Sequence, residues 1–245
     1  YPDVHYDGRT MVLAYEYLGR VMLRRSQDGL RWSRPQRVDE TGIWKKWLED
    51  CPVEEQIGEH PFVQNGYECL SGGPPGIHIA GDTVYVFVAV GQNPSGIGCY
   101  FGRVNGNARR FERCKNNPLF IGASEYGPLD EEGPAANHFF DFRTISSAEV
   151  SRLDDRYYML YEGVRGPAQG DPGDSQFGLG LARSLTDRID GPWEKFRGNP
   201  ILVDLPGNIG LGHADLVIVD GQTILYTALE KDKRSRLALV WSRKD

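Results

Sequence analysis

The sequence predicts an all-β protein, a β-propeller made of repeated antiparallel sheets, and three observations support this prediction. Four segments share one order of short alternating strands, turn residues separate these strands, and helix signals are sparse. The segments hold 31 to 55 residues, which brackets the length of a propeller blade, about 40 residues or more. A β-sandwich with several hairpins is the alternative, but a sandwich does not require the same order of elements in every unit. The four segments span 2–35, 75–120, 148–202 and 214–244.

Each segment opens with a short strand and a tight turn, followed by a second strand rich in Val, Tyr, Leu and Phe. The turns consist of residue types that tolerate the positive φ of two-residue hairpins. They are Asp7-Gly8, Gly81-Asp82, Asp154-Asp155 and Asp220-Gly221. After a variable loop come a third strand and a polar turn with an aromatic residue, which is Trp32, Phe111 or Trp193. We assign Trp32 and Trp193 to packing within the blades.

Two further features repeat between the second and third segments. Asn117-Pro118-Leu119 and Asn199-Pro200-Ile201 occupy the same place at the exit of their segments. The glycine-rich stretches 96–102 and 178–182 fall in third strands, where glycine permits close packing between strands. A dinucleotide-binding turn cannot form inside such a strand.

Composition and charge exclude several partners. The net charge of −6 argues against nucleic acid, because proteins that bind a phosphate backbone usually carry a basic stripe. The longest apolar runs, such as 84–90, are too short to cross a bilayer, so we expect no membrane partner. No leader opens the sequence, so we expect a mature or trimmed form and favour a secreted or periplasmic location. The oligomeric state stays open.

The four cysteines do not settle the compartment. They are too scattered for a disulfide scaffold, and no CxxC occurs, so we do not expect a zinc site. One or two disulfides and four reduced thiols are both open. The cysteines are Cys51, Cys69, Cys99 and Cys114.

Four motifs carry a family resemblance. The stretches SQDGLRWS (26–33), RYYMLYEG (156–163), GLGLARSLTDRIDGPWEKFRGNPIL (178–202) and GHADLVIVDG (212–221) resemble glycoside hydrolase family 43 and its relatives. The resemblance implies a five-bladed β-propeller in a single domain over 1–245. Four blades are evident in the sequence, and the fifth is either truncated at the start or a degenerate sheet within 39–64. The long loops 39–64 and 121–141 are of a length that is usually functional.

Glycoside hydrolysis needs two carboxyl groups, one to protonate the leaving oxygen and one to activate water or attack carbon. In a propeller the starts of the innermost strands converge at one end of the central channel, and the first, third and fourth segments carry Asp3, Glu149 and Asp215 there. The resemblance implies that Asp3 is the base, that Glu149 is the acid and that the configuration is inverted. The family's helper Asp in the second blade is missing, since only glycine and proline occupy 73–76. Asp215 or Asp141 is expected to supply the neighbouring negative charge.

Further residues are predicted to bind substrate. Glu16 and Glu162 end second strands, which return to the end of the channel where first strands begin, although a surface ion pair is the alternative for each. Glu162 with the nearby Arg165 suits sugar hydroxyls, because both groups form directional hydrogen bonds. His138 and Arg143 are candidates by their position before Glu149. His213 matches the family's fourth-blade histidine, which lies near the channel axis. Four aromatic residues of the long loops are expected either to stack on sugar rings or to pack in the core or a lid. They are Trp44, Trp47, Phe139 and Phe140.

These observations favour a hydrolase acting on a plant or microbial polysaccharide or oligosaccharide, with a carbohydrate as its partner. We predict that no cofactor is required, and calcium near His213 is left open. A related phosphorylase is one alternative, for which Arg143, Arg165 and His213 are the candidate phosphate ligands. A non-catalytic glycan-binding propeller is the other.

Overall fold

The structure is a computed structural model that describes residues 2–17, 20–38, 71–90, 95–105, 111–122, 140–141, 144–165, 176–203, 209–219, 222–231 and 234–244. Within these ranges every regular element is a β-strand, and all strand pairs are antiparallel. The all-β prediction is therefore confirmed.

The strands form four sheets, one for each predicted segment, and each sheet is a blade. The first blade contains β1 (Pro2–Tyr6), β2 (Met11–Tyr17), β3 (Arg20–Ser26) and β4 (Gln36–Arg37). The second contains β5 (Ser71–Ala80), β6 (Thr83–Val90), β7 (Gly96–Arg103), β8 (Glu112–Arg113) and β9 (Phe120–Ile121). The third contains β10 (Thr144–Leu153), β11 (Arg156–Arg165), β12 (Gln176–Ser184), β13 (Trp193–Lys195) and β14 (Leu202–Val203). The fourth contains β15 (Ile209–Val219), β16 (Gln222–Lys231) and β17 (Arg234–Lys244).

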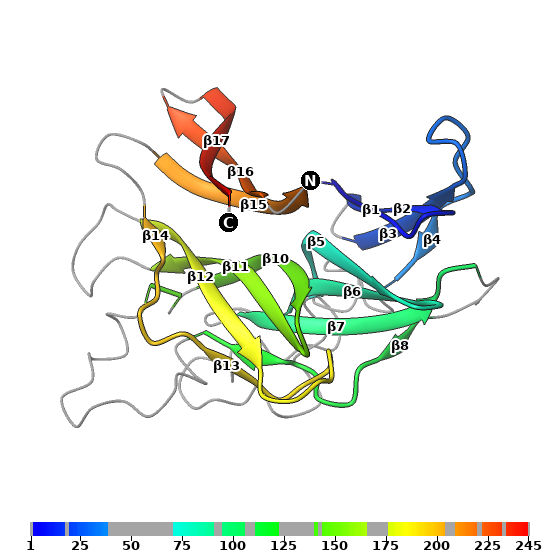
Figure 1. The fold of residues 1–245 in the computed structure, drawn as a ribbon, viewed down its shortest axis with the longest axis horizontal. Coiled ribbons are helices and arrows are strands. Elements are labelled where there is room, and N and C mark those ends of the chain that lie inside the picture. Colours follow the sequence, from blue (N-terminus) through cyan, green and yellow to red (C-terminus); the bar gives the residue numbers. More distant parts are fainter. Residues whose placement is uncertain are drawn as a thin grey trace, which may run out of the picture.

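The blades are arranged around a common centre as in a β-propeller (Figure 1). The first strand of each blade lies on the inside, and β5 contacts both β1 and β10, while β10 also contacts β15. The amino terminus lies between β15 and β1 in this view. The stretch 39–64, one of the two places predicted for a fifth blade, lies outside the described residues.

Three of the four predicted turns adopt the expected backbone. Gly8, Gly81 and Asp154 have φ values of 94°, 59° and 53°. The turns of the second and third blades contain two residues, as predicted, but the first contains four, because Tyr6 pairs with Met11. The Asp7 carboxylate stabilises this longer turn by accepting hydrogen bonds from the backbone N–H groups at positions 9 and 10, each of 2.7 Å. Asp220-Gly221 lies outside the described residues.

The repeated Asn-Pro motif has one structural role in two blades. The Asn117 side chain accepts a hydrogen bond of 2.9 Å from the backbone N–H of Cys99 in β7. The Asn199 side chain accepts one of 2.8 Å from Leu181 in β12. In each blade the asparagine side chain therefore satisfies a backbone N–H of the third strand. A short outer strand, β9 or β14, follows the asparagine and pairs with the same third strand. The repetition in sequence therefore reflects repeated geometry.

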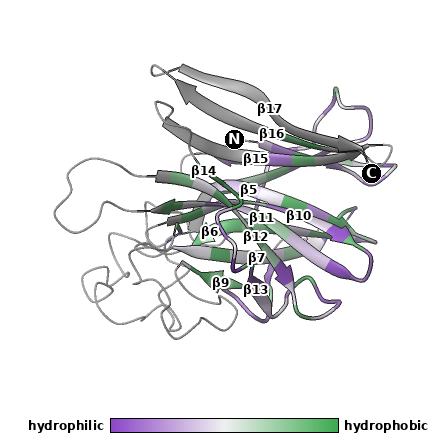
Figure 2. Cartoon of the chain, turned by 60° about the vertical axis from the view of Figure 1, so that its left-hand side comes forward, coloured by the Kyte–Doolittle hydropathy of each residue, from purple (hydrophilic) through white to green (hydrophobic). Residues whose placement is uncertain are grey.

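The core lies between neighbouring blades, because each of the three clusters of buried residues draws on two blades that follow one another in the chain. Figure 2 shows hydrophobic residues within the strands and hydrophilic residues at the turns that join them. Trp193 is buried and donates a hydrogen bond of 3.0 Å to the Ile189 carbonyl, and the partly buried Trp32 makes the equivalent bond to Gly29 at 3.1 Å. Both tryptophans pack within their blades, as predicted.

Glycines of the third blade make room for Phe140. A Cβ atom at Gly163 or Gly180 would lie 2.3 or 2.4 Å from the Phe140 ring. Phe140 is buried there and packs against Tyr161, with ring centroids 5.6 Å apart. Of the two uses predicted for this ring, Phe140 therefore serves core packing. Trp44, Trp47 and Phe139 lie outside the described residues.

A buried ion pair lies between the second and third blades. Lys195 and Asp141 are fully buried, with Nζ and Oδ2 2.8 Å apart. The Tyr161 hydroxyl donates to the same carboxylate at 3.1 Å, and Lys195 also donates to the carbonyl of Ile121 in β9. The charge of Asp141 is therefore balanced by Lys195, so this residue is not the source of negative charge for the predicted acid.

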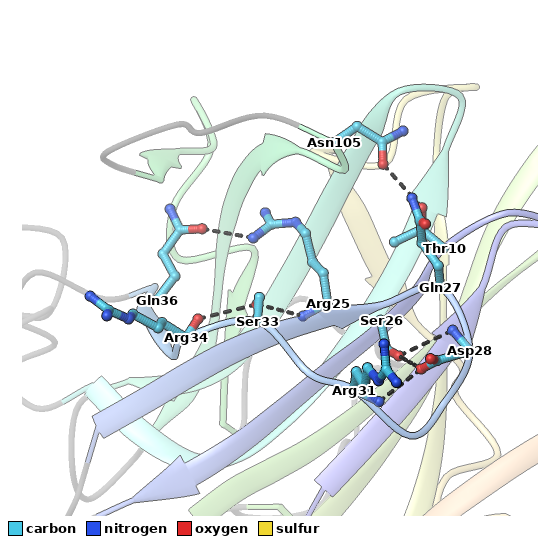
Figure 3. A pocket seen from close by; sticks show the side chains of 10 residues that line it. All are labelled: Thr10, Arg25, Ser26, Gln27, Asp28, Arg31, Ser33, Arg34, Gln36 and Asn105. Atoms are coloured by element: carbon cyan, nitrogen blue, oxygen red, sulfur yellow. Dashed lines mark hydrogen bonds between the residues drawn. The ribbon is translucent and has the colours of Figure 1, made fainter.

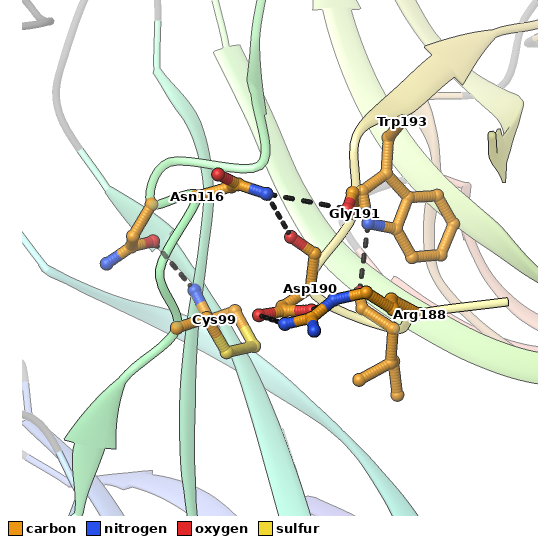
Figure 4. Close-up of a disulfide and its surroundings, with 9 residues drawn as sticks. Cys99, Asn116, Arg188, Asp190, Gly191 and Trp193 are labelled. Atoms are coloured by element: carbon orange, nitrogen blue, oxygen red, sulfur yellow. Dashed lines mark hydrogen bonds and ion pairs between the residues drawn. A yellow bond between two sulfur atoms is a disulfide. The ribbon is translucent and has the colours of Figure 1, made fainter. Parts of the chain in front are cut away.

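A disulfide joins Cys99 in β7 to Cys114 just after β8, with Cα atoms 5.3 Å apart (Figure 4). Beside it, the Asn116 side chain donates a hydrogen bond of 2.9 Å to the carbonyl of Asp190 in the third blade. Cys51 and Cys69 lie outside the described residues. In the part of the chain that the structure describes, no helix is long and apolar enough to cross a membrane.

Candidate active site

The innermost strands of the second, third and fourth blades begin earlier than predicted, and each contains an irregularity at a corresponding place. The pairing register shifts between Gly72 and Gly76, between Ser146 and Ala148, and between Gly212 and Asp215. A β-bulge bends the strand and changes the direction of the side chains that follow it. In the fourth blade regular pairing resumes at Asp215, and in the third it resumes at Ala148, the residue before Glu149. Asp215 and Glu149 are two of the three predicted catalytic residues.

Asp3, Glu149 and Asp215 line two adjoining cavities of the central channel. The smaller has a volume of about 70 Å³ and is bounded by residues at the starts of the innermost strands, including Pro74 and Gly76. The larger has a volume of about 480 Å³ and is bounded by residues further along the same strands. The fold thus brings together three carboxyl groups from three blades, as the sequence predicted. The other residues that line the larger cavity include His5, His78, Ser151, Arg152 and Leu216.

Asp3 is partly buried at the start of β1, and its Oδ2 accepts a hydrogen bond of 2.6 Å from the backbone N–H of Ile77 in β5. Burial raises the pKa of Asp3 to about 7, and the negative charge of Asp215 acts in the same direction. The hydrogen bond from Ile77 opposes this shift because it favours the ionised carboxylate. Asp3 is therefore poised to exchange a proton near neutral pH.

Glu149 has a pKa well above its usual range. The main cause is desolvation by burial, and the charges of Asp3 and Asp215 add to it. Partial desolvation also raises the pKa of Asp215, against a backbone hydrogen bond associated with Leu216 that lowers it. A carboxyl group with a raised pKa holds its proton to higher pH and can act as a general acid, so Glu149 is suited to protonate a leaving group.

The second blade contributes backbone to this site where the family resemblance implies an acidic side chain. A Cβ atom at Gly76 would lie 1.5 Å from the Ala148 carbonyl oxygen, so no side chain fits at this position. The absence of Cβ lets β5 pack directly on β10, next to Glu149. This close approach also places the N–H of Ile77 on Asp3.

Two histidines lie in the same channel, one pleat beyond the acids. His5 shares a strand face with Asp3, and His78 shares one with Gly76, because side chains alternate along a strand. The rings of His5 and His78 meet edge to face at 5.7 Å, and Nδ1 of His78 donates to the Val150 carbonyl at 2.9 Å. Burial lowers the pKa of both imidazoles. Sequence reasoning missed them, although their two-residue spacing from the predicted channel positions was a usable signal.

Of the other predicted substrate-binding residues, the structure describes the side chains of Glu16 and Glu162. Glu16 is partly buried near the end of β2, and neither it nor Glu162 is among the residues that line the two cavities. Glu162 is buried and accepts a hydrogen bond of 3.0 Å from the Ser146 hydroxyl, beside the bulge that precedes Glu149. Arg165 ends β11 and His213 lies in β15, but their side chains are not described. His138 and Arg143 lie outside the described residues.

Among the described residues, no group of three or more His, Cys, Asp or Glu side chains is arranged to hold a metal ion. The sequence left a calcium site near His213 open, and the side chain of His213 is not described. Calcium therefore stays an open prediction.

Comparison with known proteins gives similarity in structure only. No family model matches the chain, and no curated protein matches it. A solved structure described as a glycoside hydrolase is 13% identical, with a TM-score of 0.62 over 100% of this chain and 70% of the other. Zg3597, a family 117 glycoside hydrolase produced by the marine bacterium Zobellia galactanivorans, is 12% identical, with a TM-score of 0.59 over 100% and 66%. A GH43 endo-arabinanase from Bacillus licheniformis is 15% identical over 98% and 92%, with a TM-score of 0.43.

The first two similarities cover this whole chain and establish the fold as that of β-propeller glycoside hydrolases. The resemblance predicted from the motifs is confirmed at this level.

Proposed function

We propose that this protein is a glycoside hydrolase that cleaves a polysaccharide or oligosaccharide with inversion of configuration. The observation that carries the proposal is the convergence of Asp3, Glu149 and Asp215, from three blades, on one channel. The pKa of Glu149 is raised by desolvation and by the two neighbouring charges, which is the property a general acid needs. The similarity of the fold to glycoside hydrolases supports the same chemistry.

In this proposal Glu149 donates its proton to the glycosidic oxygen as the bond to the leaving group breaks. Asp3, ionised, accepts a proton from a water molecule whose oxygen forms the new bond to the anomeric carbon. Water attacks from the face opposite the leaving group, so the configuration inverts. Burial is the main cause of the raised pKa of Glu149, and the charge of Asp215 adds to the effect of Asp3.

Each turnover leaves a proton on Asp3 and removes one from Glu149. Both residues line the same two cavities, so water in the channel can return the proton from one carboxyl group to the other. Burial raises the pKa of Glu149 well above its usual range, which favours the return of the proton to it, and repulsion between the two carboxylates keeps one proton on the pair.

The test is turnover of aryl-glycosides and polysaccharides by the wild type and by Glu149→Gln. General acid catalysis contributes roughly 10²- to 10⁴-fold, so the variant should lose about this factor on substrates with poor leaving groups. It should lose much less on dinitrophenyl glycosides, whose leaving groups need no proton. Glu112→Gln, the same substitution at an exposed position of β8 that borders neither cavity, is the matched control and should keep its activity.

Other outcomes would favour the alternatives. Binding of glycans without turnover by the wild type would support a non-catalytic propeller. Turnover that requires added phosphate and releases a sugar phosphate would support a phosphorylase. Equal loss on good and poor leaving groups would remove Glu149 from the role of acid.

A further inference from the structure

A second pocket lies on the outer part of the first blade, against the second (Figure 3). It has a volume of about 740 Å³, and every described residue that lines it is polar. Most small-molecule sites are lined by apolar side chains, so a polar pocket of this kind suits a ligand that offers hydroxyl or charged groups over its surface. We call this the basic pocket. Its lining residues are Thr10, Arg25, Ser26, Gln27, Asp28, Arg31, Ser33, Arg34, Gln36 and Asn105.

The basic pocket is separate from the carboxyl groups of the channel. The strands β1 and β3 both run away from the end at which Asp3 lies, and the pocket is formed by the turns that follow them, 7–10 and 26–34. None of its described lining residues borders either channel cavity. A ligand bound there would not compete with a substrate at the carboxyl groups.

The floor of the pocket is a fixed positive charge. The Arg25 guanidinium donates to the backbone carbonyls of Arg103, at 3.0 Å, and Val104 in the second blade. It also donates to the Gln36 side chain at 2.9 Å. The Thr10 hydroxyl donates to Asn105 at 3.0 Å, a further link between the two blades. The pocket is therefore held open by contacts that do not depend on a ligand.

The rim carries positive charge that is not balanced locally. The described lining contains three arginines and one aspartate, a formal charge of +2, in a chain whose net charge is −6. The Asp28 carboxylate accepts hydrogen bonds from the backbone N–H groups of Leu30 and Arg31, at 2.9 and 2.8 Å, which lower its pKa and occupy it within the turn. Arg31 and Arg34 are exposed, and neither forms an ion pair with a carboxylate of the described residues.

We propose that the basic pocket binds an acidic oligosaccharide, with Arg31 and Arg34 on its carboxylates and the side chains of Gln27 and Asn105 on its hydroxyls. Guanidinium groups bind carboxylates with paired, charge-assisted hydrogen bonds, and amides both donate to and accept from hydroxyls. Nucleic acid is a poorer fit, because no aromatic ring among the described lining residues offers a surface for base stacking. The choice of a saccharide rests on the proposed function, whereas the choice of an anion rests on the pocket alone.

The experiment is affinity electrophoresis of the whole protein in native gels that contain polygalacturonate, with a neutral galactan as the comparison. The wild type should be retarded by polygalacturonate at low salt and less so at high salt. The variant R31Q/R34Q should bind at least about tenfold more weakly. The control R20Q/K115Q removes two exposed positive charges elsewhere and should bind like the wild type.

Several results would overturn the inference. These are no retardation by polygalacturonate, equal retardation by galactan, or unchanged binding by R31Q/R34Q. Binding of sulfate at the pocket without binding of polygalacturonate would show an anion site that does not take a saccharide. Turnover of aryl-glycosides by the same variants is measured in parallel, so failure of this inference and failure of the proposed hydrolase activity are separate results.

Discussion

The backbone N–H of Ile77 donates a hydrogen bond of 2.6 Å to Oδ2 of Asp3, and this contact joins the first two blades at the candidate site. It stabilises the ionised form of a carboxyl group whose pKa burial raises to about 7. The contact exists because the preceding residue is Gly76, which lets β5 lie against Ala148. The second blade therefore supports Asp3, the proposed base, through its backbone.

Gly76→Ala is expected to destabilise the protein and to abolish turnover. The added Cβ would lie 1.5 Å from a backbone oxygen, so β5 has to move away from β10. We expect a loss of about 3 kcal/mol or more in the free energy of unfolding, measured by urea denaturation. The neighbouring Ile77→Val keeps the backbone and should cost only about 0.5–1.5 kcal/mol. Similar stability of Gly76→Ala and wild type would contradict the close approach of the two strands.

Asp215→Asn should move the pH profile of kcat/KM to lower pH. The charge of Asp215 raises the pKa of Glu149 and that of Asp3, so its removal lowers both. In the proposed mechanism Glu149 reacts in its protonated form and Asp3 in its ionised form, so both limbs of the profile should shift in the acid direction. Asp155→Asn, at an exposed turn, is the matched control and should leave the profile in place. A profile that stays fixed in Asp215→Asn would exclude Asp215 from the site.

Asp3→Asn should change how stability depends on pH. The pKa of Asp3 is about 7 in the folded protein, against 3.8 for an unperturbed carboxyl, so the folded state holds this proton more tightly than the unfolded state. The stabilisation is therefore complete below the unfolded value and is lost as pH rises towards 7. Asparagine cannot ionise, so the variant should lack this loss and be more stable at pH 8 by a difference on the order of 4 kcal/mol. Urea denaturation at pH 4, 6 and 8 measures it, with Asp82→Asn as an exposed control.

Lys195→Met should be strongly destabilising because it leaves the fully buried Asp141 without its counter-ion. We expect a cost of about 3–5 kcal/mol in thermal or urea unfolding. The double variant K195M/D141N removes both charges and should recover part of that loss. Arg183→Gln breaks an exposed pair with Glu194 and should cost no more than about 1 kcal/mol. Equal stability of the single and double variants would show that the Asp141 charge is not the source of the cost.

The repeat in the sequence predicted the four blades, the positive φ at Gly8, Gly81 and Asp154, and the packing roles of Trp32 and Trp193. These features are local, because turn chemistry and strand alternation act over a few residues. The predicted two-residue length of the first turn was wrong. Tyr6 pairs with Met11, which leaves four residues in the turn, and this pairing depends on the register across the hairpin.

The repeated pattern in the sequence predicted the fold and the convergence of Asp3, Glu149 and Asp215 on the inner strands, because each occupies the same point of its repeat. Only Asp3 lies at the start of its strand, whereas Glu149 and Asp215 lie within β10 and β15, which begin earlier than predicted. Which charges meet became visible only when the blades were in place. The tertiary structure assigned Asp141 to Lys195, joined Ile77 to Asp3 and placed His5 beside His78. Charge and hydrogen-bond partners depend on distances between blades, and residues far apart in the chain carry no local signal of those distances.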